Sequence, residues 1–305
     1  MIKIRYKLAI FMLFSTLLII IAASLYITTN LTGKPSFIFR GPNNVTVILN
    51  FSMPEFPSDV ALLKIDKLNY SEAEAIHIAR NLFNLTGELS VRYLNWGIAV
   101  GNEIHTVEFY YCGAVNYLVP YSCLPIPATL PSKSEARAIA ERFLEKLKSY
   151  GLLPKNPKVK IEFQGVEPDI RSSMYGVITL EVSFRAYYGE MPFYGGSDDI
   201  AIIIGDEGKI LGFYGMWREV KEVGKVGITV GVEEAIKRLA SEHGLRSNLS
   251  KITIKQIRLA YWVGVIDRTS KYLPPIYLFE AEVIYANGSK GRAKLWIPAT
   301  EIQPP

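Results

Sequence analysis

Histidine and cysteine are scarce in this chain, whose 305 residues include three histidines and two cysteines. The histidines, His77, His105 and His243, show no spacing typical of metal ligands, and no His-Glu-X-X-His motif occurs. Two cysteines without a neighbouring histidine cannot supply the four ligands of a closed zinc site. The sequence therefore predicts no metal site.

The signature motifs of common enzymes are also missing. No Gly-X-Ser-X-Gly elbow, Walker loop or dinucleotide fingerprint occurs. Asp198 and Asp199 follow a glycine-rich stretch and favour a solvated loop, and Glu181 lies in a pattern typical of an alternating strand. We therefore predict no catalytic residue and no small-molecule cofactor. A site assembled from distant residues stays open, because such sites are recognised by their geometry.

The chain also lacks any run of like charge. Its net charge is +5, and Lys3, Arg5 and Lys7 supply three of those charges. A groove for nucleic acid needs a stripe of basic residues, which the sequence does not show. We therefore predict that nucleic acid is not a partner.

One long apolar run is present at residues 8–27, directly after these three cations. At ~1.5 Å per residue, a helix over this run covers the ~30 Å hydrocarbon core of a bilayer. The cationic side stays in the cytoplasm. The sequence therefore predicts a single-pass anchor in the lipid bilayer, a cytoplasmic N-terminus and an extracytoplasmic body. A signal peptide cleaved near Ala22-Ala23-Ser24 is the alternative, and it also exports the body.

Asparagine occurs mostly in glycosylation sequons. Seven of the 13 asparagines begin an Asn-X-Ser/Thr triplet in which X is not proline, several times the number expected by chance. Such triplets mark surface positions of exported proteins. The predicted glycosylation sites are Asn30, Asn44, Asn50, Asn69, Asn84, Asn248 and Asn287.

The two cysteines, Cys112 and Cys123, enclose ten residues. An oxidising exterior favours a disulfide between them, and closing so short a loop contributes ~2–3 kcal/mol. Two separate thiols are the alternative. We predict the disulfide.

Helix signals occur three times in the exported body, each followed by strand patterns. Ser71-Glu72-Ala73-Glu74 and Ser132-Lys133-Ser134-Glu135 are capping boxes, and a third helix begins near Val232. A helix with one apolar stripe must cover something, and an antiparallel sheet offers one apolar face. The predicted fold class is therefore α+β: an N-terminal transmembrane helix followed by repeated modules of one helix packed on an antiparallel β-sheet.

These signals predict six segments. They are a cytoplasmic tail (1–7), a transmembrane anchor (8–27), a linker with N-terminal strands (28–68) and three α+β modules (69–130, 131–222 and 223–305).

The middle module carries a family resemblance. Ser134-Glu135-Ala136 opens its helix, Tyr187–Phe193 ends a strand, and Ile203–Ile210 is typical of strand, turn and strand. This series resembles the PepSY-type module and the YycH–YycI-type extracytoplasmic regulators, over roughly residues 131–300. The resemblance implies binding or inhibition of a partner and supplies no catalytic residues. The sequons and the cysteine loop depart from the bacterial regulators and favour another host, such as an archaeon.

The resulting functional hypothesis is a membrane-anchored, non-enzymatic glycoprotein that binds another membrane or cell-surface protein. One alternative is a structural subunit of a surface filament or envelope layer, in which the apolar helix packs in an assembly. The other is an extracellular hydrolase with an unrecognised site.

Overall fold

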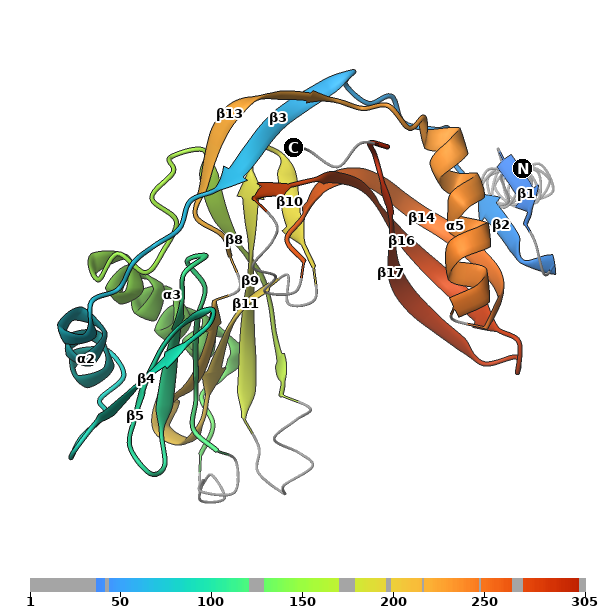
Figure 1. Ribbon diagram of the computed structural model, residues 1–305. Coiled ribbons are helices and arrows are strands. Elements are labelled where there is room, and N and C mark those ends of the chain that lie inside the picture. The colour runs from blue at the N-terminus through green and yellow to red at the C-terminus, as the bar shows by residue number, and fades with distance from the viewer. Residues whose placement is uncertain are drawn as a thin grey trace, which may run out of the picture. The chain divides into compact units, whose positions relative to one another are not determined.

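The computed structural model describes residues 37–41, 44–120, 129–169, 179–195, 199–215, 217–246, 248–264 and 271–301 (Figure 1). Strands make up 49% of the structure and helices 18%, so sheet dominates. The predicted transmembrane segment, residues 8–27, lies outside the described residues. Among the residues that are described, no helix is both long enough and apolar enough to cross a membrane.

The chain divides into two compact units. The first unit comprises Met1–Glu55, Val232–Ile257 and Leu278–Ile297, and the second comprises Phe56–Gly231, Arg258–Tyr277 and Pro298–Pro305. Among the described residues, hydrogen bonding links fourteen strands in one mixed sheet, and three further strands form a small second sheet.

The first unit is a five-stranded sheet with one helix. Its strand order is β1-β2-β14-β16-β17, in which β1 is antiparallel to β2 and β2 is parallel to β14. The elements are β1 (Phe37–Arg40), β2 (Thr46–Leu49), α5 (Val232–Arg246), β14 (Leu249–Trp262), β16 (Pro275–Tyr285) and β17 (Lys290–Pro298). The end of β14 from Arg258, the start of β16 up to Tyr277 and Pro298 of β17 belong to the second unit. Val47, Ile252 and Leu239 are fully buried, because alternate strand residues face the apolar stripe of α5.

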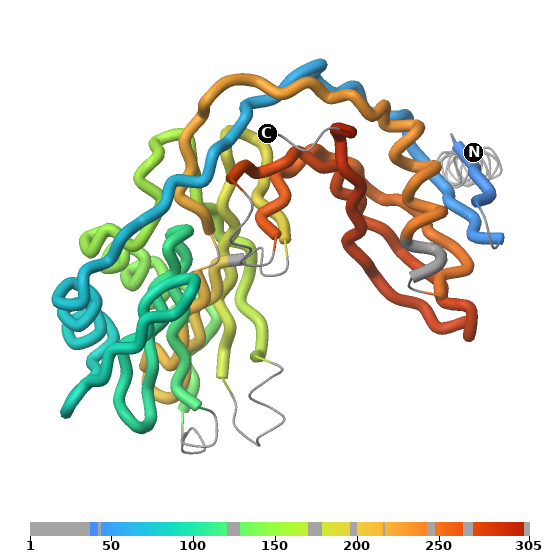
Figure 2. Tube along the Cα trace, viewed as in Figure 1, coloured from blue at the N-terminus to red at the C-terminus, as the bar shows by residue number. Residues whose placement is uncertain are grey.

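The second unit is built on a sheet of order β8-β9-β11-β12-β7-β6-β5-β4, and β10 also pairs with β9. The small sheet has the order β13-β3-β15, and β3 and β13 run side by side in Figures 1 and 2. The elements are β3 (Asp59–Ile65), α2 (Glu72–Asn81), β4 (Ser90–Leu94), β5 (Gly97–Gly101), β6 (Thr106–Tyr110), β7 (Val115–Leu118), α3 (Lys133–Ser149), β8 (Val159–Pro168), β9 (Leu180–Tyr188), β10 (Met191–Tyr194), β11 (Asp199–Ile204), a 3₁₀ turn (Asp206–Gly208), β12 (Ile210–Gly215), β13 (Val220–Gly227) and β15 (Tyr272–Leu273).

The predicted fold class is wrong, because the described residues form a large mixed sheet in place of repeated helix-on-sheet modules. β7 and β12 belong to two different predicted modules, yet they pair antiparallel with Gly212 opposite Leu118. This pairing joins the strands on either side into one large mixed sheet. The expected modules merge because a strand satisfies its backbone groups with any neighbour of suitable geometry, near or far in sequence.

The helix starts predicted from local sequence signals agree with the structure better than the predicted modules do. Ser132 and Glu135 form the predicted capping box at the start of α3, with both reciprocal hydrogen bonds present. Ser71 caps α2 by accepting a hydrogen bond from the Glu74 backbone N–H at 3.2 Å. The predicted capping box is thus confirmed at α3, whereas at α2 only the Ser71 half of it is present. Such caps are predictable because they depend on residues three positions apart.

Both helices of the second unit pack on its sheet through aromatic rings. Phe83, just after α2, lies 4.8 Å from Tyr117 of β7, between ring centroids, and 6.2 Å from Phe143 of α3. Phe143 in turn meets Phe213 of β12 edge to face at 5.9 Å. These contacts place the four rings in one core, and tilted and edge-on contacts are the favoured arrangements of aromatic pairs.

A substitution at Gly97, the first residue of β5, tests how tightly β5 and β6 pack. A Cβ atom on Gly97 would overlap the backbone carbonyl of Phe109, whereas one on Gly165 in β8 would have no neighbour within 4 Å. We predict that Gly97→Ala lowers the free energy of unfolding by about 3 kcal/mol, the upper range for overpacking. The matched variant Gly165→Ala should change it by less than about 1 kcal/mol. Denaturant unfolding measures both, and equal effects would contradict the packing of β5 against β6.

Candidate binding site

Charged side chains gather on the face of the first unit's sheet that points away from α5. In β17, Lys290, Arg292 and Lys294 are exposed. Gly291 and Ala293 between them are half-buried, and Leu295 and Ile297 beyond them are buried. The same alternation in β14 and β16 leaves Lys255 and Glu282 exposed. A strand shows opposite faces at successive residues, so the apolar positions cover α5 and the charged ones face solvent.

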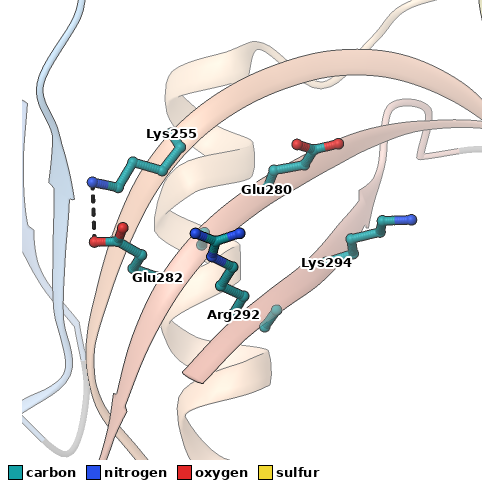
Figure 3. A pocket seen from close by; sticks show the side chains of 7 residues that line it. Lys255, Glu280, Glu282, Arg292 and Lys294 are labelled. Atoms are coloured by element: carbon teal, nitrogen blue, oxygen red, sulfur yellow. Dashed lines mark ion pairs between the residues drawn. The ribbon is translucent and has the colours of Figure 1, made fainter. Parts of the chain in front are cut away.

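A groove of about 420 Å³ lies on this charged face, across three neighbouring strands (Figure 3). We call it the charged groove. Its lining residues are Lys255, Glu280, Ala281, Glu282, Arg292, Ala293 and Lys294. The lining has no large apolar side chain, so the groove suits a polar ligand or a polar protein surface.

The charged groove mixes both signs of charge. The ammonium group of Lys255 lies 3.0 Å from the Glu282 carboxylate, and about half of each side chain is exposed. Exposed pairs of this kind contribute only about 0–1 kcal/mol, so a ligand displaces them at little cost. Among the described residues, no carboxylate lies within 4.0 Å of the Arg292 guanidinium, whose planar fork suits a carboxylate or a phosphate.

Sequence reasoning missed this face. Lys290, Arg292 and Lys294 alternate with small or apolar residues, and such period-two charge is the signal that marks one face of a strand. A search for contiguous basic runs does not detect it.

The second unit holds a compact cluster of titratable groups around Glu222 of β13. Its carboxylate accepts hydrogen bonds from the Lys158 ammonium at 2.6 Å and from the Tyr188 hydroxyl at 2.5 Å. These two bonds hold the pKa of Glu222 below its usual value, and the bond to Glu222 raises the pKa of Lys158. Burial, followed by the bond to Glu222, raises the pKa of Tyr188. All three shifts move the groups away from neutral pH, so the cluster is an ion-pair network and is poorly suited to acid–base catalysis.

The described sequons all lie on the surface. The asparagines of six sequons, Asn44, Asn50, Asn69, Asn84, Asn248 and Asn287, are exposed, and Asn30 lies outside the described residues. By contrast, Asn102, Asn116 and Asn156, which begin no sequon, are half-buried. Asn81 and Asn95 also begin no sequon and are exposed, so exposure is common among the described asparagines and agrees with the sequons without being unique to them.

Three of these sequons meet at one end of the first unit's sheet. Asn44 lies in the β1–β2 turn, Asn248 directly precedes β14, and Asn287 lies in the β16–β17 turn. Thr46 of β2 pairs with Lys251 of β14, and the Ala286 N–H donates to the Asn248 carbonyl at 2.8 Å. This convergence was not predictable from the sequence, because it depends on strand order.

The other predicted positions do not come together. Cys112 is half-buried in the β6–β7 turn, and Cys123 lies outside the described residues, so their disulfide stays a prediction. His77 contacts Asn81 within α2, and His105 lies beside Tyr117 at 6.4 Å between ring centroids. Within the described ranges, no three His, Cys, Asp or Glu side chains gather in a way that would hold a metal.

Comparison with known proteins does not identify a family or a function for this chain. No family model matches the chain, and no curated protein matches it. Eleven chains of solved structures match, among them an uncharacterized protein from Eubacterium rectale ATCC 33656 that is 10% identical. That match covers 83% of this chain and 88% of the other, with a TM-score of 0.47, and a likeness of this level carries no argument about function.

The cluster around Glu222 gives a prediction for pH dependence. A carboxylate whose pKa is lowered in the folded protein stabilises it above the unfolded pKa, near 4.5, and that stabilisation is lost as the pH falls through the folded pKa. We expect Glu222→Gln to reduce the drop in Tm between pH 6 and pH 3, because the variant has no carboxylate to protonate. Thermal unfolding followed by circular dichroism measures the drop. Glu88→Gln, at an exposed carboxylate, is the control and should leave the pH dependence as in the unmodified chain.

Proposed function

We propose that this chain is an exported, glycosylated, non-enzymatic binding protein of the cell surface. In this proposal residues 8–27 hold it in the membrane as a single-pass anchor, with the N-terminus in the cytoplasm and both units outside. The observation that carries the proposal is the exposure of all six described sequon asparagines. A glycan needs an accessible asparagine, and the half-buried asparagines among the described residues begin no sequon.

Turn geometry accounts for part of this pattern but not for all of it. Asn44, Asn84 and Asn248 have positive φ angles of 61°, 54° and 51°, a conformation that asparagine tolerates better than most residues. That preference explains the asparagine alone. It does not require the hydroxyl residue two positions later, which at Asn44 and Asn84 is Thr46 and Thr86.

Three other sequon hydroxyls have structural roles of their own, and one of them, Ser289, donates to the Asn287 side-chain oxygen at 2.7 Å. Ser71 caps α2, and the Ser250 hydroxyl donates to the Ile284 carbonyl at 3.1 Å. The sequons of Asn44 and Asn84 therefore give the proposal its most specific support.

Binding fits the surface chemistry better than catalysis does. The charged groove offers paired charges and the Arg292 guanidinium, and its lining includes no Ser, Thr, Cys or His side chain. We propose that the groove contacts another membrane or cell-surface protein through complementary charges, which give specificity more than affinity. The resemblance to PepSY-type modules is consistent with such a partner and stays a prediction.

Glycan occupancy tests the export part of the proposal. We expect the chain made in a glycosylating host to lose mass on treatment with peptide-N-glycosidase. Thr46→Ala and Thr86→Ala should each remove one glycan, because they destroy the sequon and keep the asparagine in its turn. Mass spectrometry of glycopeptides measures the occupancy. Asn95, exposed but outside any sequon, is the internal control and should stay unmodified. The proposal would be contradicted if none of the six described sequons carried a glycan.

A charge reversal tests the binding part. We expect Arg292→Glu to abolish cross-linking of the chain to its partner in native membranes, because it places a third carboxylate in the charged groove. Arg142→Glu, an equal charge change at an exposed position of α3, should leave cross-linking intact. Cross-linked species are quantified by mass spectrometry. Equal yields from both variants would rule out the groove as the contact surface.

A further inference from the structure

The outer edge of β8 is open. β8 pairs with β9 along one side, and among the described residues no strand pairs along its other side. The register with β9 is regular from Val159 to Phe163 and shifts before Gly165. An edge strand presents unpaired N–H and C=O groups that a further strand can bond. The regular part of this edge is therefore five residues long.

Alternate residues of this segment face two different surroundings. Val159, Ile161 and Phe163 are half-buried and line a groove of about 580 Å³ beside α3. Lys160 and Glu162 are exposed on the opposite face of the strand. An added strand would therefore place apolar side chains in the groove and polar ones in solvent.

The groove has an apolar floor and a charged rim. Leu144, Leu153 and Phe184 lie in its lining next to the three half-buried residues of β8. On the rim, the Arg137 guanidinium stacks over the Phe163 ring at 4.3 Å from its centroid. Apolar surface of this kind beside an open strand edge is an incompletely buried core.

The charges of β8 are self-complementary. If a second β8 runs antiparallel with Ile161 opposite its own copy, Lys160 faces Glu162 of the second copy, and Glu162 faces its Lys160. Val159 then faces Phe163 of the second copy. Opposite charges placed directly across a strand pair are favourable, and so are apolar pairs.

We propose that two copies of this chain associate through β8, in an antiparallel pair with a two-fold axis at Ile161. The half-buried residues of each copy fill the groove beside α3 of the other. α3 contacts both β8 and β9, so the two copies of α3 lie roughly 10 Å apart, twice the spacing of neighbouring strands and a normal distance between packed helices. The association is isologous and closes as a dimer.

The sequon pattern is compatible with this contact. No sequon begins between residues 85 and 247, a stretch that includes both α3 and β8. This point rests on the proposed glycosylation. The complementary charges and the open edge do not, so the dimer can be tested whether or not glycans are present.

Charge exchange on β8 tests the dimer in the full chain, purified in mild detergent. Lys160→Glu places like charges opposite each other across the axis, and so does Glu162→Lys, so we expect each to weaken the dimer by roughly tenfold or more. The double variant K160E/E162K restores opposite charges and should restore the dimer. Light scattering after size-exclusion chromatography, over a range of concentrations, measures the association.

Two controls separate this contact from others. Lys160 also lies 3.7 Å from Glu190, with 60% of the Lys160 side chain exposed, so Glu162→Lys provides a second single variant without that pair. Lys221→Glu, at an exposed position of β13, makes the same charge change elsewhere and should leave the dimer intact. A monomer at all concentrations would overturn the proposal. A dimer that is unchanged in both single variants would also overturn the proposal and would indicate association through residues 8–27 or another surface. A double variant that stays monomeric would overturn it as well and would indicate that the β8 edge binds a strand of a different protein.

Discussion

The antiparallel pairing of β7 with β12 is the interaction on which the second unit depends. It joins Val115–Leu118 to Ile210–Gly215, segments that lie almost a hundred residues apart in the chain. Bringing such distant strands together costs loop-closure entropy, which the shared core must offset. The offset comes from the aromatic rings on both sides of the junction, where Tyr117 and Phe213 meet the rings of Phe83 and Phe143. Without the pairing, α2 and α3 would cover separate small sheets.

Because the second unit depends on pairing between distant segments, the sequence predicts its local features but not its strand partners. The capping box of Ser132 and Glu135 was predictable because its partners are three residues apart, and the turn at Asn287-Gly288 was predictable for the same reason. Strand partners were not, because an alternating apolar strand fits any complementary neighbour, and the sequence does not say which. Counting helix and strand units from local signals therefore gave three modules where pairing over long distances gives one mixed sheet.

The candidate site shows the same division between local and distant information. The alternation of Lys290, Arg292 and Lys294 was visible in the sequence and defines one face of β17. That Lys255 and Glu282 lie beside it was not visible, because β14, β16 and β17 become neighbours only in the folded sheet. The convergence of Asn44, Asn248 and Asn287 has the same origin. Positions on one strand face are thus predictable, and the combination of strands is not.

Two of the edge strands among the described residues, β8 and β17, differ in whether their charges favour pairing with a second copy of the chain. An antiparallel self-pair of β17 centred on Arg292 would place Lys290 opposite Lys294 of the second copy and Arg292 opposite its own copy, so every exposed contact would be repulsive. Such lysine-rich edges are a common protection against edge-to-edge association. In β8 the same operation places Lys160 opposite Glu162, and every exposed contact is attractive. Both strands carry charged residues at alternate positions, so charge density alone does not distinguish them. The order of positive and negative charges along each strand does distinguish them. It disfavours pairing of β17 with itself and leaves β8 as the edge that a second copy fits.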